Sequence, residues 1–332
     1  MKVLFVYFKY HPKPPHLSNM HSNLTGSFLS IYEDDPNFTY EHVYICDEPG
    51  GIKTAAELDH VLLTMEYDVA IVSEYKEAFV SLETAKKVGK KLFIMMWDTH
   101  NGWTTNRYVN FRLFLKQPYD LGYVKRDYSL MEFAKYANVY AIDYGFGEML
   151  PNVYCEVCPQ DAKYFNVDDS VERDIDVLFN GTVYTKERMD FLQHLKNQGI
   201  NVTVRGGKSE SGEFLSFEDY AMCFKRAKIS LSFQQSGISI QRKGRELEAA
   251  ACGGFVISTN PEVWKCHSGA WFEEGKHIAK MDWDNCAERI RYFLNNTEER
   301  LNIAKALNQR YEEICSPRAW WERVFARVHD KD

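Results

Sequence analysis

The sequence predicts an α/β protein made of two domains, each built around a parallel sheet. Short β-branched or apolar runs alternate with polar segments of helical spacing, and this alternation occurs twice, on either side of a stretch without clear periodicity. The chain has 332 residues, of which 45% are hydrophobic, so it can bury two cores. We therefore expect two α/β domains that face each other across a cleft, where ligands of such folds bind.

The first domain is expected over residues 1–155. Short branched and apolar runs predict its strands at residues 3–7, 43–46, 69–73, 92–96 and 139–143. Helical spacing predicts a helix over residues 77–87. Residues 149–165 contain Pro151 and Pro159 and have neither the period nor the length of an element, so this stretch is expected to be the linker.

The second domain is expected over residues 167–312. Its strands are predicted at residues 176–179, 202–205, 229–233 and 255–258, and its helices at residues 186–197, 245–251 and 285–294. A long helical pattern begins at Thr297, breaks at Pro317, and continues as a helix that contains Trp320, Trp321 and Phe325.

Composition and charge exclude several classes of protein. The chain has 40 basic and 47 acidic residues, and its net charge of −7 argues against a wholly basic nucleic-acid-binding protein but leaves room for a local basic patch. No signal peptide and no apolar run of about 18 residues is present, so a cytoplasmic protein without a membrane span is expected. The eight cysteines are dispersed and are expected to be reduced thiols, and Cys155 and Cys158 have no second ligand pair for a metal.

The segment from Gly244 to Val256 is the most informative motif. Arg245 and Glu248 are three residues apart and share one face of a helix, which Gly253 ends. An arginine can clamp a diphosphate, and a carboxylate can accept hydrogen bonds from ribose hydroxyls. The alternative is an ordinary surface ion pair beside a helix terminus.

This segment resembles the donor-site helix of GT-B glycosyltransferases, in the form seen in the spore-maturation-type family and, more loosely, in the T-even phage DNA β-glucosyltransferases. Residues 176–188 and 200–207 are similar to other parts of the same donor domain. The resemblance implies a GT-B fold with two Rossmann-like domains, an acceptor domain over 1–155, a donor domain over 167–312, and a C-terminal helix over 313–332 that crosses back to the first domain. It implies a nucleotide-sugar donor, expected to be a UDP-sugar, and no required cofactor or metal. The donor-binding residues it implies are Gly181, Thr182, Arg188, Gly206, Arg245 and Glu248.

The loop after residues 176–179 supports this interpretation, because backbone N–H groups at a helix N-terminus favour anions and small residues allow close approach. Arg188 adds a cation for the same phosphates. The alternative is a generic turn between a strand and a helix.

Asp98 follows the predicted strand at residues 92–96, and an acid at the carboxyl end of a parallel strand projects towards the ligand. This segment resembles the strand and aspartate that supply the base in the phage β-glucosyltransferases, so Asp98 is the expected general base, with His100 as its substitute. The alternative for Asp98 is an N-cap or turn residue. Ile240 stands where many retaining GT-B enzymes have the first of two glutamates, which favours an inverting single displacement.

Residues 103–126 mix basic and aromatic side chains, a combination suited to phosphate contact and base stacking. The expected acceptor-binding residues are Trp103, Arg107 and Arg112, together with His16 from a loop near the start of the chain. The alternative is an amphipathic helix with a solvated basic face.

The leading acceptor is a hydroxymethylated pyrimidine in phage DNA, which would make double-stranded DNA with modified bases a partner and the host cytoplasm the site of action. The alternatives are a surface or spore glycan or a protein as acceptor, a non-catalytic nucleotide-sugar-binding protein, and a two-domain nucleotide-sugar epimerase. The transferred sugar, a hexosyl or pentosyl group, is left open.

Overall fold

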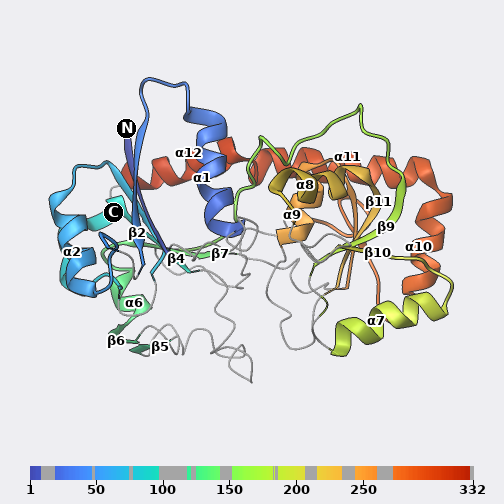
Figure 1. Ribbon diagram of the computed structural model, residues 1–332, viewed down its shortest axis with the longest axis horizontal. Coiled ribbons are helices and arrows are strands. Elements are labelled where there is room, and N and C mark those ends of the chain that lie inside the picture. Colours follow the sequence, from blue (N-terminus) through green and yellow to red (C-terminus); the bar gives the residue numbers. More distant parts are fainter. Residues whose placement is uncertain are drawn as a thin grey trace. The chain divides into compact units, whose positions relative to one another are not determined.

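The computed structural model describes residues 1–8, 19–46, 49–74, 78–96, 118–120, 125–142, 152–181, 183, 186–205, 215–233, 244–259 and 272–329. The chain forms two compact units, which Figure 1 shows in ribbon form. Unit 1 comprises Met1–Lys13, Ile31–Glu156 and Trp321–Asp332, and unit 2 comprises Pro14–Ser30 and Val157–Trp320.

Unit 1 contains a parallel sheet of six strands in the order β2-β1-β3-β4-β7-β8. The strands are β1 (Lys2–Phe8), β2 (Thr39–Ile45), β3 (Val69–Val72), β4 (Leu92–Met96), β7 (Asn138–Ile142) and β8 (Val153–Glu156). β8 lies within the stretch expected to be a linker, so that expectation was wrong for these residues. The strand is only four residues long and pairs in parallel with β7, a long-range partner that sequence periodicity cannot reveal.

The helices of unit 1 begin at clear capping residues where the structure describes them. Thr54 and Glu57 form a capping box, and the Ser81 hydroxyl accepts a hydrogen bond from the Thr84 N–H, so the helix predicted from residue 77 begins only at Leu82. The helical elements are α2 (Ala55–Thr64), α3 (Leu82–Val88), a 3₁₀ turn (Gly89–Lys91), α6 (Leu130–Phe133) and α12 (Pro317–His329), which enters unit 1 at Trp321. Helix α1 (Asn19–Tyr32) belongs to unit 2 as far as Ser30 and ends in unit 1. A separate antiparallel hairpin is formed by β5 (Pro118–Asp120) and β6 (Lys125–Ser129).

The two faces of the unit 1 sheet are packed differently. Aliphatic side chains such as Leu4 and Val72 face Leu58 of α2 and Phe133 of α6. Aromatic side chains line the opposite face, where the fully buried Trp321 of α12 lies edge-on to Phe5, with ring centroids 5.9 Å apart. The last helix of the chain therefore completes the core built around its first strand.

A cluster of charged side chains attaches α12 to the edge of this sheet. Glu156, at the end of β8, forms ion pairs of 2.9 Å with both Arg323 and Arg327, and its side chain is 5% exposed. Arg327 lies over the Tyr154 ring at 3.8 Å and donates a hydrogen bond to the Tyr140 hydroxyl. We call Glu156, Arg323 and Arg327 the unit 1 ion cluster, in which each charge has a partner of opposite sign.

Unit 2 contains a parallel sheet of five strands in the order β10-β9-β11-β12-β13. Its strands are β9 (Ile175–Asn180), β10 (Thr203–Arg205), β11 (Ala227–Ser232), β12 (Phe255–Ser258) and β13 (Ala279–Lys280). Its helices are α7 (Lys186–Asn197), α8 (Phe217–Arg226), α9 (Gly244–Ala251), α10 (Cys286–Asn295) and α11 (Thr297–Ile314).

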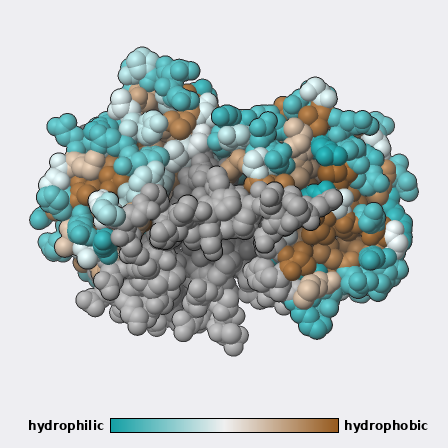
Figure 2. All heavy atoms as spheres, viewed as in Figure 1, coloured by the Kyte–Doolittle hydropathy of each residue, from teal (hydrophilic) through white to brown (hydrophobic). Residues whose placement is uncertain are grey.

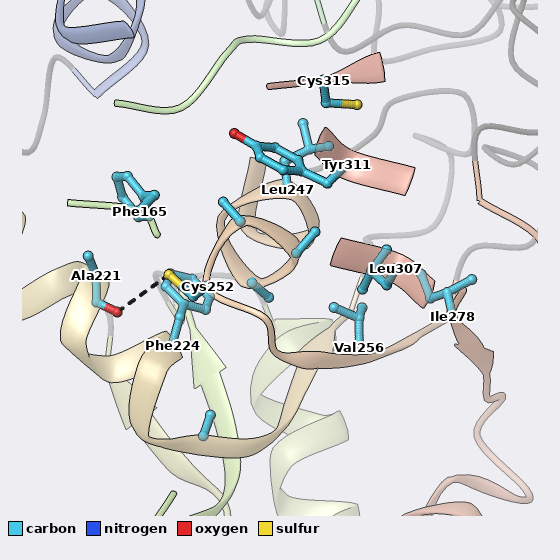
Figure 3. Close-up of a cluster of buried hydrophobic side chains, with 14 of the residues drawn as sticks. Phe165, Ala221, Phe224, Leu247, Cys252, Val256, Ile278, Leu307, Tyr311 and Cys315 are labelled. Atoms are coloured by element: carbon cyan, nitrogen blue, oxygen red, sulfur yellow. Dashed lines mark hydrogen bonds between the residues drawn. The ribbon is translucent and has the colours of Figure 1, made fainter. Parts of the chain in front are cut away.

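The core beneath α9 holds that helix tightly. Leu247 and Cys252 lie among side chains of α8 and α11, and the Cys252 Sγ lies 4.0 Å from the carbonyl oxygen of Ala221 (Figure 3). Gly253 ends the helix with a φ of 64°, a conformation that favours glycine, as the sequence predicted. The Arg173 guanidinium donates hydrogen bonds to four carbonyl oxygens at the ends of α8 and α9, those of Phe224, Ala227, Cys252 and Gly253.

The surface of unit 2 carries hydrophobic side chains amid hydrophilic surroundings on the face that Figure 2 shows. The large hydrophobic residues exposed in this unit are Val167, Met189, Val204, Trp283, Tyr292 and Leu301. Among the described residues, every helix is too short or too polar to cross a membrane.

Candidate functional site

Polar residues end three neighbouring strands of the unit 2 sheet. Asn180, Ser232 and Ser258 are the last residues of β9, β11 and β12, and all three are buried. Because these strands are parallel, the three residues mark one edge of the sheet. Gly181 follows β9, and its N–H donates to the carbonyl oxygen of Arg205 at the end of β10, 2.9 Å away.

Arg245, in the first turn of α9, lies against the end of β9. Its guanidinium stacks over the Phe179 ring at 4.9 Å, and its Nη1 lies 3.4 Å from the carbonyl oxygen of Phe233. A Cβ atom added to Gly181 would lie 2.7 Å from Nη2 of Arg245, closer than real Cβ contacts allow. Glycine at position 181 therefore makes room for the arginine.

A second buried cation lies near Arg245. Arg188, from the first turn of α7, is 6% exposed. Burial lowers the pKa of Arg245, and the positive charge of Arg188 lowers it further. Guanidinium groups of this kind are suited to an anion that carries more than one negative charge, which is the role predicted for them from the sequence.

Glu248 lies one turn after Arg245 on α9 and is 6% exposed. Its Oε2 accepts a hydrogen bond of 2.9 Å from the hydroxyl of Tyr220 on α8. Burial raises the pKa of Glu248 to about 7, while the Tyr220 hydrogen bond and the charge of Arg245 oppose the rise. The carboxylate therefore titrates near neutral pH.

The third charged residue of α9, Glu246, connects this helix to the sheet. It is buried, and its Oε1 accepts a hydrogen bond of 2.8 Å from the Ser258 hydroxyl at the end of β12. This bond fixes the first turn of α9 to the sheet. Arg245 is held at the same turn, at the end of β9.

The structure thus brings together four of the residues singled out from the sequence, Gly181, Arg188, Arg245 and Glu248. Sequence reasoning missed Tyr220, Phe179 and Glu246. The sequence does carry a signal for the start of α8, because Ser216 is a typical N-cap residue and its hydroxyl accepts a hydrogen bond from the Asp219 N–H. No sequence pattern relates Tyr220 to a glutamate 28 positions later.

The other predicted site residues lie outside the described residues. These are the general base Asp98 and its substitute His100, Thr182 and Gly206 on the donor side, and His16, Trp103, Arg107 and Arg112 on the acceptor side. Of the basic and aromatic stretch at residues 103–126, the last two residues, Lys125 and Arg126, are described and belong to strand β6 rather than to a helix. Within the described part of the chain, no group of three His, Cys, Asp or Glu side chains is arranged to hold a metal ion.

One family model matches part of the chain. Residues 187–326 match a family model described as glycosyl transferase-like. A search of curated proteins found no match.

Solved structures cover the whole chain. The T4 alpha-glucosyltransferase in complex with UDP-glucose and DNA containing an abasic site has a TM-score of 0.62 and 10% identity, covering 99% of this chain and 100% of that one. HepE of Anabaena in complex with UDP-glucose has a TM-score of 0.60 and 12% identity, covering 99% of both chains. AviGT4, a glycosyltransferase involved in avilamycin A biosynthesis, has a TM-score of 0.56 and 12% identity, covering 98% of this chain and 96% of that one.

At these levels of identity the likeness to solved structures establishes the fold, and it confirms the predicted GT-B fold and the predicted resemblance to GT-B glycosyltransferases. The match of residues 187–326 to a glycosyl transferase-like family model agrees with the predicted class of enzyme.

Proposed function

We propose that the protein transfers a sugar from a UDP-sugar to an acceptor hydroxyl, and that unit 2 binds the donor. The observation that carries this proposal is the pair of buried cations, Arg188 and Arg245, beside Gly181 at the carboxyl edge of the unit 2 sheet. A nucleoside diphosphate supplies the multiple negative charge that such a pair binds. The solved structures with UDP or UDP-glucose support a uridine nucleotide as donor.

In this proposal each donor-site residue has a distinct role. Arg188 and Arg245 contact the diphosphate and stabilise the negative charge that develops on it as the bond to the sugar breaks. The Glu248 carboxylate accepts hydrogen bonds from the ribose hydroxyls. The backbone N–H groups near Gly181, with Thr182 and Gly206, complete the phosphate contacts at the start of α7.

Asp98 is proposed as the general base that removes the proton from the acceptor hydroxyl, with His100 as its substitute. The oxygen then attacks the anomeric carbon on the side opposite the diphosphate, so the configuration inverts. Ile240, in place of a glutamate eight positions before Glu248, supports this single displacement. A product with retained configuration, measured by NMR of the anomeric proton, contradicts this part of the proposal.

For the acceptor we propose a hydroxymethylated pyrimidine in DNA, as a phage enzyme in a host cytoplasm would encounter it. The basic and aromatic residues Trp103, Arg107 and Arg112, with His16, support it, because a flipped base needs phosphate contacts and a stacking surface. One similar structure, an alpha-glucosyltransferase, was solved with UDP and a 13-mer DNA containing a HMU base.

A glycan acceptor is the second candidate. The chain carries a net charge of −7, which opposes binding to DNA, and HepE and AviGT4 are similar to this chain to nearly the same degree as the DNA-bound enzyme. A chain that binds UDP-sugars without turnover is the remaining alternative.

The donor is tested by thermal unfolding of the purified chain with UDP, GDP, ADP and TDP. At about 100 times its dissociation constant, a bound nucleotide stabilises the folded chain by about 2.7 kcal/mol. We expect this shift with UDP, and no shift with any nucleotide would contradict the proposed donor site.

The reaction is tested with UDP-sugars on DNA containing hydroxymethylated pyrimidines and on free oligosaccharides. We expect product on the modified DNA, and Asp98→Asn should lose most turnover while binding UDP as tightly as the wild type. Product on oligosaccharide alone replaces DNA by a glycan as the acceptor. Absence of turnover with every acceptor, despite UDP binding, favours the non-catalytic alternative.

A further inference from the structure

The hydrogen bond between Tyr220 and Glu248 joins two helices at the candidate donor site. Tyr220 is 9% exposed, and its ring is held on two sides by Phe165 and Phe224, with ring centroids 6.3 Å and 5.4 Å away. Its hydroxyl lies 2.9 Å from Oε2 of Glu248. The position of the ring is thus set by the core, and the hydroxyl transmits that position to the carboxylate.

The two oxygens of Glu248 have different surroundings. Oε2 accepts the hydrogen bond from Tyr220, whereas the described part of the chain offers no donor to Oε1. Oε1 lies on the side of Gly244, 3.8 Å from the point where a Cβ of that residue would stand. Because Gly244 has no side chain, it does not cover Oε1 from that side.

We infer that Tyr220 is a positioning residue, which fixes the Glu248 carboxylate with Oε1 available to the ribose and so gives the site a preference for ribonucleotides over 2′-deoxyribonucleotides. The inference rests on the proposed function, in which Glu248 binds the ribose. A carboxylate held at one oxygen presents the other at a defined place, where it accepts a hydrogen bond from the 2′-hydroxyl. A 2′-deoxyribose lacks the hydroxyl that donates this hydrogen bond and keeps only its 3′-hydroxyl.

The charged and ionisable groups that face Glu248 determine how it titrates. Within the described residues these are Tyr220 from α8, Arg245 from α9, Cys252 just after α9, and, through its effect on Arg245, Arg188 from α7. Tyr220 and Arg245 both favour the ionised carboxylate. Removing the Tyr220 hydroxyl therefore shifts the titration of Glu248 to higher pH, whereas looser packing that exposes the carboxylate to water shifts it to lower pH.

The test compares UDP with 2′-deoxy-UDP by isothermal titration calorimetry on the full chain. Hydrogen bonds to charged groups commonly contribute tenfold or more in affinity, so we expect the wild type to prefer UDP by about tenfold. In Tyr220→Phe we expect the preference to fall to about threefold or less, and the pH midpoint of UDP binding to rise above that of the wild type.

Tyr311→Phe is the matched control. Tyr311 is 2% exposed in the core of the same unit, near Leu307 and Cys315 (Figure 3), and its hydroxyl interacts with the backbone of Gln160 rather than with Glu248. This variant should keep both the wild-type preference and the wild-type midpoint. Circular dichroism and thermal unfolding show whether the two variants are equally folded.

A double-mutant cycle separates positioning from general packing. In a Glu248→Gln background the preference for UDP should already be lost, and adding Tyr220→Phe should change it no further. An unchanged preference in Tyr220→Phe, or an equal loss in Tyr311→Phe, overturns the inference while leaving the proposed donor site intact. A wild-type chain that binds no UDP contradicts the proposed function itself, and the role of Tyr220 falls with it.

Discussion

Each unit buries a cluster of charged side chains, and the two clusters differ in how their charges are balanced. In the unit 1 ion cluster, Glu156 lies between Arg323 and Arg327, and both ion pairs are formed within the protein. In unit 2, Arg188 and Arg245 lie near each other, and the nearby carboxylate, Glu248, is held by a tyrosine. The first cluster pairs each arginine with the same acid and joins two segments of chain, whereas in the second the two guanidinium groups repel each other.

This difference follows from the packing around each cluster. In unit 1, aromatic rings such as those of Tyr140 and Tyr154 surround Arg327 and leave little room for a ligand. In unit 2, Gly181 makes room for the Arg245 guanidinium itself, and Gly244 carries no side chain beside Glu248. Aromatic rings therefore surround the arginine of the first cluster, whereas glycines lie beside the charged residues of the second.

The largest expected effect concerns the unit 1 ion cluster. Glu156→Gln removes the only acid of the unit 1 ion cluster and leaves the guanidinium of Arg327, on a side chain that is 17% exposed, without its negative partner. We expect the free energy of unfolding, measured by urea denaturation, to fall by about 3 kcal/mol. UDP affinity should stay within about twofold of the wild type, and a large loss of affinity would show that the two clusters are not independent.

The second effect concerns the two buried arginines of unit 2, Arg188 and Arg245. Arg245→Ala removes one of two cations that repel each other, so we expect UDP binding to weaken by about 100-fold while thermal stability is kept or raised. Calorimetry and thermal unfolding measure the two quantities on the same sample. A variant that loses stability and keeps its UDP affinity would assign Arg245 the architectural role of the unit 1 arginines.

The third and smallest effect is a pH dependence that only unit 2 should show. The pKa of Glu248 is raised to about 7, and the ionised form is the one that accepts hydrogen bonds from both ribose hydroxyls. UDP affinity should therefore rise by about tenfold from pH 6 to pH 8. Glu248→Gln should lack this rise. Any pH dependence that remains in this variant comes from the titration of UDP itself, so the variant serves as the control.

The same raised pKa has the opposite effect on folding. Because Glu248 binds its proton more tightly in the folded chain than in the unfolded chain, stability is highest below pH 4.5 as far as this group is concerned, and it falls as the pH rises towards 7. Wild type and Glu248→Gln should therefore differ in the slope of stability against pH between these values.

Much of the fold could be read from the sequence because buried parallel strands are short apolar runs. β1, β3, β4 and β9 lie where such runs occur, and the helix that carries Arg245 ends at Gly253 as predicted. β8 could not be read because its identity as a strand depends on pairing with β7. Helices α1, α2 and α8 were also missed, since their apolar positions are interrupted by polar residues that are buried or that cap a helix.

The candidate site was predictable only as far as local spacing reaches. Arg245 and Glu248 are one helical turn apart, so their shared face follows from the sequence. Tyr220 reaches Glu248 through the packing of α8 against α9, and Phe179 reaches Arg245 through the sheet. Such tertiary contacts have no local signature, which is why they were found only in the structure.

The contact between Phe5 and Trp321 has a consequence for the order in which the chain folds during synthesis. Trp321 belongs to unit 1, but it follows the whole of the main segment of unit 2, Val157–Trp320, along the chain. Contacts between residues so far apart form late, because a long loop must first be closed. On the ribosome, the domain that is translated first is therefore the last to finish its core, and until α12 has been made the aromatic face of its sheet stays uncovered and open to chaperones or to aggregation.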